Sequence, residues 1–145
     1  MLIIGGCELP LEKNPYNSVE ILDSNQHTIM KEQMLIPVRG SMAHFYNSKL
    51  YLFGGCKGPK DHISDVQIYD IISKQWHLAP YKLIKERSCF MMTSVDQSQL
   101  YILGGFDGYE CLREVETIDL SDDMPSFKQL QSLSHPVKNG QCFYS

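Results

Sequence analysis

Three short apolar runs, each closed by a pair of glycines, lie at nearly equal intervals along the chain. The first glycines of the pairs are Gly5, Gly54 and Gly104, which lie 49 and 50 residues apart. A short apolar run bounded by turn residues is typical of a strand that is buried on both faces. Glycine at the end of such a strand lets the chain turn and lets a neighbouring backbone approach closely. The interval therefore predicts three copies of one β-rich unit.

A second set of segments alternates between apolar and polar residues and ends in aspartate. The segments are Val19–Asp23, Val66–Asp70 and Val115–Asp119. Alternation with a period of two predicts strands with one buried face. Turn residues at 46–49 and 95–99 predict hairpins that join an upstream strand, at about 41–46 in the second unit, to the apolar strand. Residues 73–78 predict a turn and a fourth, outer strand, and no long segment has the period of a helix.

The second unit carries residues that resemble a kelch repeat. Arg39, the pair Gly54-Gly55, Tyr69 and Trp76 follow one another in the order and at the spacing of that repeat. The third unit adds the loop Phe106-Asp107-Gly108, which resembles a loop of the kelch-like ubiquitin-ligase adaptors. The resemblance implies an all-β fold, a partial kelch β-propeller of about three four-stranded antiparallel blades, or half of a six-bladed ring.

The first and third units depart from the kelch pattern. Leu22 and Ile118 stand where the second unit has Tyr69, and Phe127 replaces Trp76 two residues late. We expect a single partial propeller over residues 1–145. Its repeats are expected at about 1–36, without an innermost strand, at 37–84 and at 85–134, with 135–145 beginning a further innermost strand.

Three blades are fewer than the roughly four to eight that close a propeller. Open blades expose apolar surface and unpaired backbone, and both favour association. Two interpretations stay open. The chain is a fragment of a longer protein whose other blades complete the ring, or two copies form a homodimer that closes a six-bladed ring about a twofold axis.

Composition narrows the range of partners. The chain has 145 residues, 43% of them hydrophobic, and a formal net charge of −4. It therefore has the material for a core but no basic field to attract phosphates, and no nucleic-acid partner is expected. The sequence has no apolar run long enough to span a membrane, and residues 1–4 are too short for a signal peptide. We expect a cytoplasmic protein without membrane contact.

The cysteines and histidines predict neither a disulfide framework nor a metal centre. There are five cysteines, an odd number, and no two of them form a C-x-x-C pair. Free thiols are therefore expected, and no metal or cofactor is expected. Cys7 and Cys56 follow two of the glycine pairs directly, and the redox activity of either thiol stays an open question.

Candidate binding residues follow from the resemblance, because the loops of a propeller carry its ligand surface. In kelch-like adaptors this surface comprises the loop after the glycine pair and the loop that leads into the innermost strand. The matching residues here are Glu8, Ser41, Lys57, His62, Cys89, Asp107, Tyr109 and Glu110. Ser41 and Cys89 stand where adaptors with basic pockets carry arginine, which argues against a strongly acidic ligand.

A second group of residues is expected to act structurally. The arginines should donate hydrogen bonds to loop carbonyls between blades, and the aromatic residues should pack with a hydrogen-bonded polar tip. The group comprises Gly5, Gly6, Arg39, Gly54, Gly55, Tyr69, Trp76, Arg87, Gly104 and Gly105.

The function that the resemblance implies is protein–protein interaction. We expect substrate recognition of the type performed by a kelch-like adaptor of a cullin ubiquitin ligase, whose BTB and BACK domains are not in this sequence. One alternative is a cytoskeletal scaffold that binds actin. Another is a degenerate propeller enzyme of the galactose oxidase type, but the sequence shows no convergent set of Tyr, His and Cys ligands and no paired acid and base. No enzymatic activity is expected.

Overall fold

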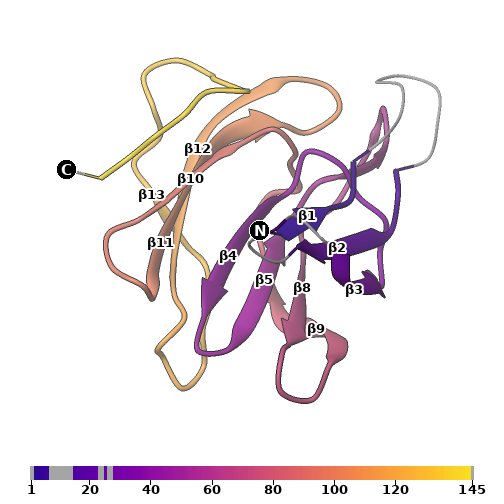
Figure 1. Ribbon diagram of the computed structural model, residues 1–145. Helices are drawn as coiled ribbons and strands as arrows, with labels where there is room; N and C mark the ends of the chain where they lie inside the picture. The colour runs from indigo at the N-terminus through magenta and orange to yellow at the C-terminus, as the bar shows by residue number, and fades with distance from the viewer. Residues whose placement is uncertain (1, 7–14, 23–24, 26–27, 145) are drawn as a thin grey trace.

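The protein is all-β, as the alternation of its sequence predicts. The computed structural model describes residues 2–6, 15–22, 25 and 28–144, and in these ranges the regular elements are strands. They form three antiparallel sheets and one small hairpin (Figure 1).

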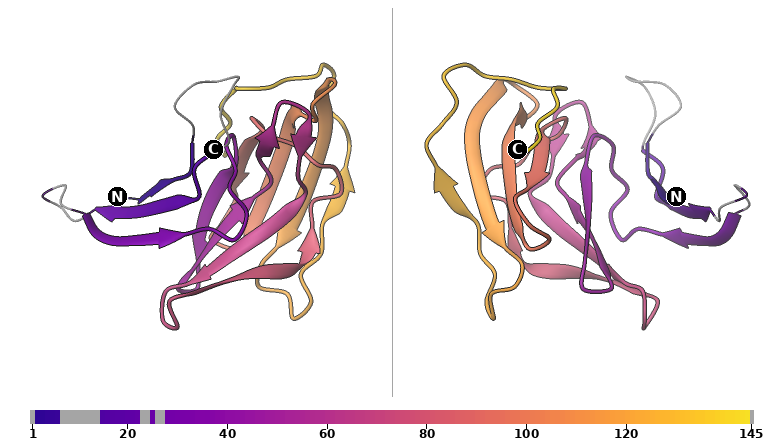
Figure 2. Two further views of the ribbon diagram at one scale, coloured as in Figure 1. Left: turned by 90° about the vertical axis from the view of Figure 1, so that its right-hand side faces the viewer. Right: turned by 60° about the vertical axis from the view of Figure 1, so that its left-hand side comes forward.

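The sheets follow one another in chain order and lie side by side like blades (Figure 2). The first has the order β1 (Leu2–Ile4), β2 (Ser18–Leu22), β3 (Thr28–Gln33). The second has the order β4 (Met42–Tyr46), β5 (Lys49–Phe53), β8 (Asp65–Asp70), β9 (Gln75–Lys82). The third has the order β10 (Met91–Ser94), β11 (Gln99–Phe106), β12 (Cys111–Asp119), β13 (Lys128–Leu130). The hairpin pairs β6 (Cys56–Gly58) with β7 (Asp61–His62).

At each glycine pair, the backbone of a sheet lies against the linker that leads from that sheet onward along the chain. Gly54 has φ +54°, and a Cβ atom built on it would lie 2.7 Å from the carbonyl oxygen of Arg87. The next glycine, Gly55, donates its N–H to the same oxygen at 2.8 Å. A side chain would block this approach, so glycine is required.

The same contact corrects the predicted alignment of the repeats. Gly6 and Gly105 donate their N–H groups to the carbonyl oxygens of Val38 and Val137, as Gly55 does to that of Arg87. Arg87 is therefore the counterpart of Val38, and not of Arg39 as the sequence pattern indicates. The offset is one residue.

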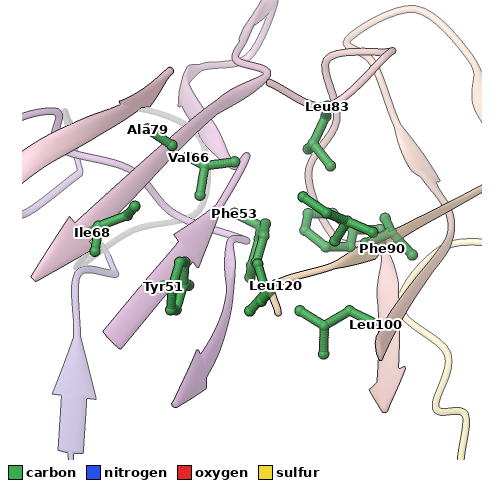
Figure 3. Packing of buried hydrophobic residues seen from close by; sticks show 11 residues of the cluster. Tyr51, Phe53, Val66, Ile68, Ala79, Leu83, Phe90, Leu100 and Leu120 are labelled. Carbon is green, nitrogen blue, oxygen red and sulfur yellow. The ribbon is translucent and has the colours of Figure 1, made fainter. Parts of the chain in front are cut away.

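A broad apolar core holds the second and third sheets together. Figure 3 shows Tyr51, Phe53, Val66 and Ile68 of the second sheet facing Leu100 of the third. A second, smaller cluster joins the first sheet to the second through Val19, Met34, Val38, Leu52 and Ile63. Alternate residues of β5 therefore serve opposite interfaces, as a strand buried on both faces requires.

The outer strands bear out the expected replacement of tryptophan by phenylalanine. Trp76 pairs with Tyr69 in the register of β8 and β9, and their rings lie 5.2 Å apart. Extending the register of β12 and β13 places Phe127 opposite Ile118 in the same way. Phe127 packs against the core between the second and third sheets, with its ring 6.3 Å from that of Phe53.

The chain beyond β13 differs from the expectation of a further innermost strand. Residues 131–144 contain no strand. Val137 donates its N–H to the carbonyl oxygen of Leu112, and Asn139 donates to that of Cys89. A strand is stabilised by its ladder with a neighbour, and no described strand lies in register beside 140–144.

Candidate functional site

The predicted binding loops gather at one end of the molecule, the upper end in Figure 1. We call this end the loop face. It comprises hairpin β6–β7, loop 106–110, the linkers 39–41 and 84–90, and segment 137–141. Two isolated bridges tie it together, one between Arg39 and Cys56 and one between Ser88 and Phe106.

Hairpin β6–β7 packs directly against loop 106–110. The ring of His62 meets that of Phe106 edge-on, with centroids 5.5 Å apart. The ammonium group of Lys60 lies 5.6 Å from the centre of the Tyr109 ring. His62 and Tyr109, two predicted binding residues that follow glycine pairs of successive repeats, are thus on touching loops.

Loop 106–110 is held in one shape by its own hydrogen bonds and by a lysine. Oδ1 of Asp107 accepts the N–H groups of Tyr109 at 2.9 Å and Glu110 at 2.8 Å. Nζ of Lys85 lies 3.2 Å from Asp107 and 3.7 Å from Glu110. Burial opposes the ionisation of Asp107, but the two N–H donors and Lys85 outweigh it, and the pKa of this carboxyl is lowered.

The loop presents Tyr109 to solvent. Its side chain is 76% exposed, although the backbone on both sides of it is fixed. Glu110 is exposed beside it, and Lys57 and Asp61 form an exposed ion pair of 3.2 Å on the neighbouring hairpin. The surface around Tyr109 therefore combines an aromatic ring with both signs of charge.

Ser41 and Cys89 meet in a hollow of about 280 Å³ near the start of the innermost strands. Cys89 donates its N–H to the carbonyl oxygen of Gly40, and Asn139 donates to that of Cys89. Gly40, Cys89 and Asn139 have φ of +65°, +54° and +55°. A residue in the left-handed conformation therefore recurs at the same position after each of the three sheets. The other lining residues are Met42, Phe90, Gly140 and Gln141, and none of the lining side chains is charged.

Arg87 occupies a buried structural position. Its guanidinium donates to the carbonyl oxygens of Lys85, Gly104 and Glu114 at 3.3, 2.8 and 3.1 Å. It also forms a 2.5 Å ion pair with Glu116, and the two side chains are 0% and 1% exposed. Burial lowers the pKa of Arg87, while Glu116 and Glu114 act in the opposite direction. Arg39 lies on the linker to β4 and is only partly buried.

The prediction that the indole N–H of Trp76 is hydrogen-bonded is wrong. The indole nitrogen is buried and has no hydrogen-bond partner among the described residues. The packing that was expected of it is present, but the polar tip is not satisfied there.

The sequence missed three lysines that shape the loop face. Lys85 bridges Asp107 and Glu110, Nζ of Lys60 lies 5.6 Å from the centre of the Tyr109 ring, and Nζ of Lys138 lies 4.4 Å from the centre of the Phe106 ring. Lys138 follows Val137, the counterpart of Val38, and so stands at the position of Arg39. Lys60 and Lys85 stand at no recurring position, so no pattern marks these two. Glu8, which was predicted for this face, and Cys7, whose redox activity stays an open question, lie outside the described residues.

Residues 2–6, 15–22, 25 and 28–144 contain neither a metal-binding cluster nor a membrane-spanning helix. No group of three or more His, Cys, Asp or Glu in that part of the chain is placed to hold a metal ion. Cys56, Cys89, Cys111 and Cys142 are free thiols, and Cys56 is buried. The same ranges contain no helix with the length and apolar character to cross a membrane.

Comparison with known proteins agrees with this geometry. Residues 39–82 match the kelch motif family. The chain is similar to a solved structure titled "Structure of YjhT", with a TM-score of 0.79 and 12% sequence identity over 94% of this chain and 50% of that one. The chain thus spans half the length of YjhT, and at this identity the likeness concerns the fold alone. No curated protein matches the sequence.

Proposed function

Because the chain has the fold of part of a kelch-type β-propeller, we propose that it is a protein-recognition module whose partner binds the loop face. The observation that carries this proposal is the fixed loop 106–110, which projects an exposed Tyr109. Tyrosine offers a large rigid contact area together with a polar tip, and it is enriched at binding hot spots. A loop that is already ordered loses little conformational entropy when a partner binds.

The charges around Tyr109 support a peptide of mixed charge as the ligand. Lys57 and Asp61 are partners on one side, and Lys85 holds Glu110 on the other. The hollow at Ser41 and Cys89 has no charged lining. A strongly acidic ligand would gain little there, because strong binding of carboxylates uses clustered arginines.

Within this class we favour substrate recognition for a cullin ubiquitin ligase. The support is the resemblance of Phe106-Asp107-Gly108 to the loop of kelch-like adaptors. Domains that contact the cullin are outside residues 1–145, so they would come from further sequence or from a second protein. The expected cytoplasmic location belongs to this proposal.

The experiment compares three forms of the chain as bait in cell lysate: the wild type, Tyr109→Ser and Ile72→Ser. Ile72 is 81% exposed and lies in the turn between β8 and β9, at the opposite end from the loop face. We expect the wild type and I72S to retain one set of partners that Y109S loses. Cullin subunits with a substrate support the adaptor role, whereas actin alone supports a scaffold.

Equal capture by all three forms would contradict recognition through loop 106–110.

A separate measurement, the metal content of the purified protein, tests the alternative of an enzyme. Stoichiometric copper or iron in the purified protein would contradict a purely binding role.

A further inference from the structure

A buried imidazole lies between the two loops that form the proposed binding surface. His62, at the end of β7, is 6% exposed. Its Nδ1 atom is buried and has no hydrogen-bond partner among the described residues. Buried polar atoms normally have a partner, so this nitrogen is a feature that the packing of a β-hairpin does not explain.

Loop 106–110 rests directly on this ring. A Cβ atom built on Gly108 would lie 2.9 Å from Nδ1 and 3.3 Å from Cε1 of His62, and 3.2 Å from the Cα of Lys60. Gly108 has φ +100°, a conformation that suits glycine. The ring of Phe106 covers another side of the imidazole edge-on. The imidazole is therefore enclosed by the loop that presents Tyr109.

We propose that His62 is a pH-sensitive latch: the neutral imidazole lets loop 106–110 close against hairpin β6–β7, and protonation of Nδ1 opens the loop, so that Tyr109 loses its fixed position. The neutral ring carries its proton on Nε2, because Nδ1 has no acceptor beside it. Protonation would place an N–H donor and a positive charge against the backbone of Gly108. A buried charge without a partner is costly, so the loop moves aside and water reaches the ring.

The charged groups that face His62 come from every element around it. They are Asp61 on its own hairpin, Asp107 on the loop, Glu86 on the linker after β9, and Arg39 on the linker before β4. Burial lowers the pKa of His62 below its usual 6.5, although the three carboxylates oppose this shift. These carboxylates also offer partners to the imidazolium once the loop has moved.

The direction of the effect follows from linkage. The pKa of His62 is lower in the closed state than in the open state, so opening takes up a proton. The closed loop is fully favoured above pH 6.5, and it loses stability as the pH falls from 6.5 through the lowered pKa. Opening by one proton changes the equilibrium by at most about tenfold per pH unit.

The test measures amide hydrogen exchange of residues 106–110 in the whole chain at pH 7.5 and 5.5, divided by the exchange rate of an unstructured peptide at each pH. We expect the wild type to open several-fold more at pH 5.5, with an upper bound of about tenfold per pH unit below 6.5. His62→Phe keeps an aromatic ring that cannot titrate, and it should remove the pH dependence. His77→Phe changes an exposed histidine on β9 and should leave the dependence intact.

Equal pH dependence in the wild type and H62F overturns the latch. Should H62F fail to fold, the wild type decides alone: the imidazole of His62 and the amide of Gly108 must titrate in NMR spectra with one common midpoint below 6.5. Separate midpoints, or a midpoint above 6.5, overturn it. Neither readout needs a ligand, so the latch can fail while the proposed function stands, and the reverse; only its consequence for partner binding depends on that function.

Discussion

Arg87 and Glu116 form a buried ion pair at the two positions that Val38 and Gln67 occupy one sheet earlier. Oε1 of Gln67 accepts the N–H of Ile36, and its Nε2 donates to the carbonyl oxygen of the same residue. Glu116 accepts the N–H of Lys85, the counterpart of Ile36, but a carboxylate cannot donate. Arg87 supplies that donor to the carbonyl oxygen of Lys85. The backbone groups of Ile36 and Lys85, at equivalent positions in successive linkers, are thus hydrogen-bonded in two different ways. The amide of Gln67 binds the first, and the Arg87–Glu116 ion pair binds the second.

This equivalence predicts how the pair responds to substitution. Arg87→Val leaves the Glu116 carboxylate buried without its cation and should lower the free energy of unfolding by about 3–5 kcal/mol. The double variant Arg87→Val, Glu116→Gln copies the neutral arrangement of the second sheet. It should return to within about 1 kcal/mol of the wild type. Urea denaturation measures both.

The control is the more exposed ion pair between Lys82 and Asp65, 2.8 Å apart. Lys82→Gln should change stability by less than about 1 kcal/mol. A double variant no more stable than R87V would show that the two repeats do not satisfy their linkers in interchangeable ways.

The close approach at Gly54 predicts a second effect. Gly54→Ala forces a side chain into a left-handed conformation and against the carbonyl oxygen of Arg87. It should cost at least about 1–2 kcal/mol. Gly58→Ala is the matched control, because a Cβ there would meet only the Asp61 side chain at 4.0 Å. Equal denaturation midpoints for the two variants would contradict the tight contact.

Replacing Trp76 by phenylalanine should lower the stability of the protein unusually little. Trp76→Phe removes part of the buried ring and also removes an indole N–H that has no partner among the described residues. The two effects oppose each other, because an unsatisfied buried donor costs about 1–3 kcal/mol. We expect W76F to lose less than about 1.5 kcal/mol, and Trp76→Ala to lose about 3–5 kcal/mol. A similar loss for both variants would indicate that the indole N–H is satisfied.

Two substitutions of Asp107 distinguish the contribution of its hydrogen bonds to the binding loop from that of its ion pair with Lys85. Asp107→Asn keeps an oxygen that can accept the N–H groups of Tyr109 and Glu110, but it loses the ion pair with Lys85. Asp107→Ala loses both. Amide exchange of loop 106–110 at pH 7.5 should rise strongly in D107A and less in D107N, since D107N keeps both hydrogen bonds and loses only the partly buried ion pair.

The pH dependence of the wild-type loop provides the check. The pKa of Asp107 is lower than its usual 3.8, so the stabilisation by its carboxylate is present above pH 3.8 and is lost as the pH falls through the lowered pKa. Loss of loop protection that tracks Asp107 at a pH above 3.8 would contradict the hydrogen bonds assigned to it.

Sequence patterns predicted the strands because burial on one or both faces leaves a direct trace. The alternating segments Val66–Asp70 and Val115–Asp119 correspond to β8 and β12. These strands are buried on both faces and not on one, because the polar side chains of Gln67 and Glu116 are buried against the linkers before β4 and β10. Phe127 could be matched to Trp76 for the same reason, since both fill an interface between sheets.

Sequence patterns gave a wrong result where the alignment of two repeats is offset by one residue. Residue type, a basic residue followed by a small one, matched Arg87 to Arg39, although Arg87 lies 32 residues after Gly55 just as Val38 lies 32 residues after Gly6. Lys60, Lys85 and Lys138 act through long side chains that reach across to other loops, and no period along the chain records such a reach.

The central claim, recognition of a protein through loop 106–110, is tested most directly by cross-linking from a single position. A photoreactive phenylalanine analogue is placed at position 109, or at position 72 as the exposed control at the opposite end, and the chain is irradiated in cells. The account predicts one discrete protein adduct from position 109 and none of the same mass from position 72. Adducts of equal yield and identity from both positions, or none from position 109, would contradict it.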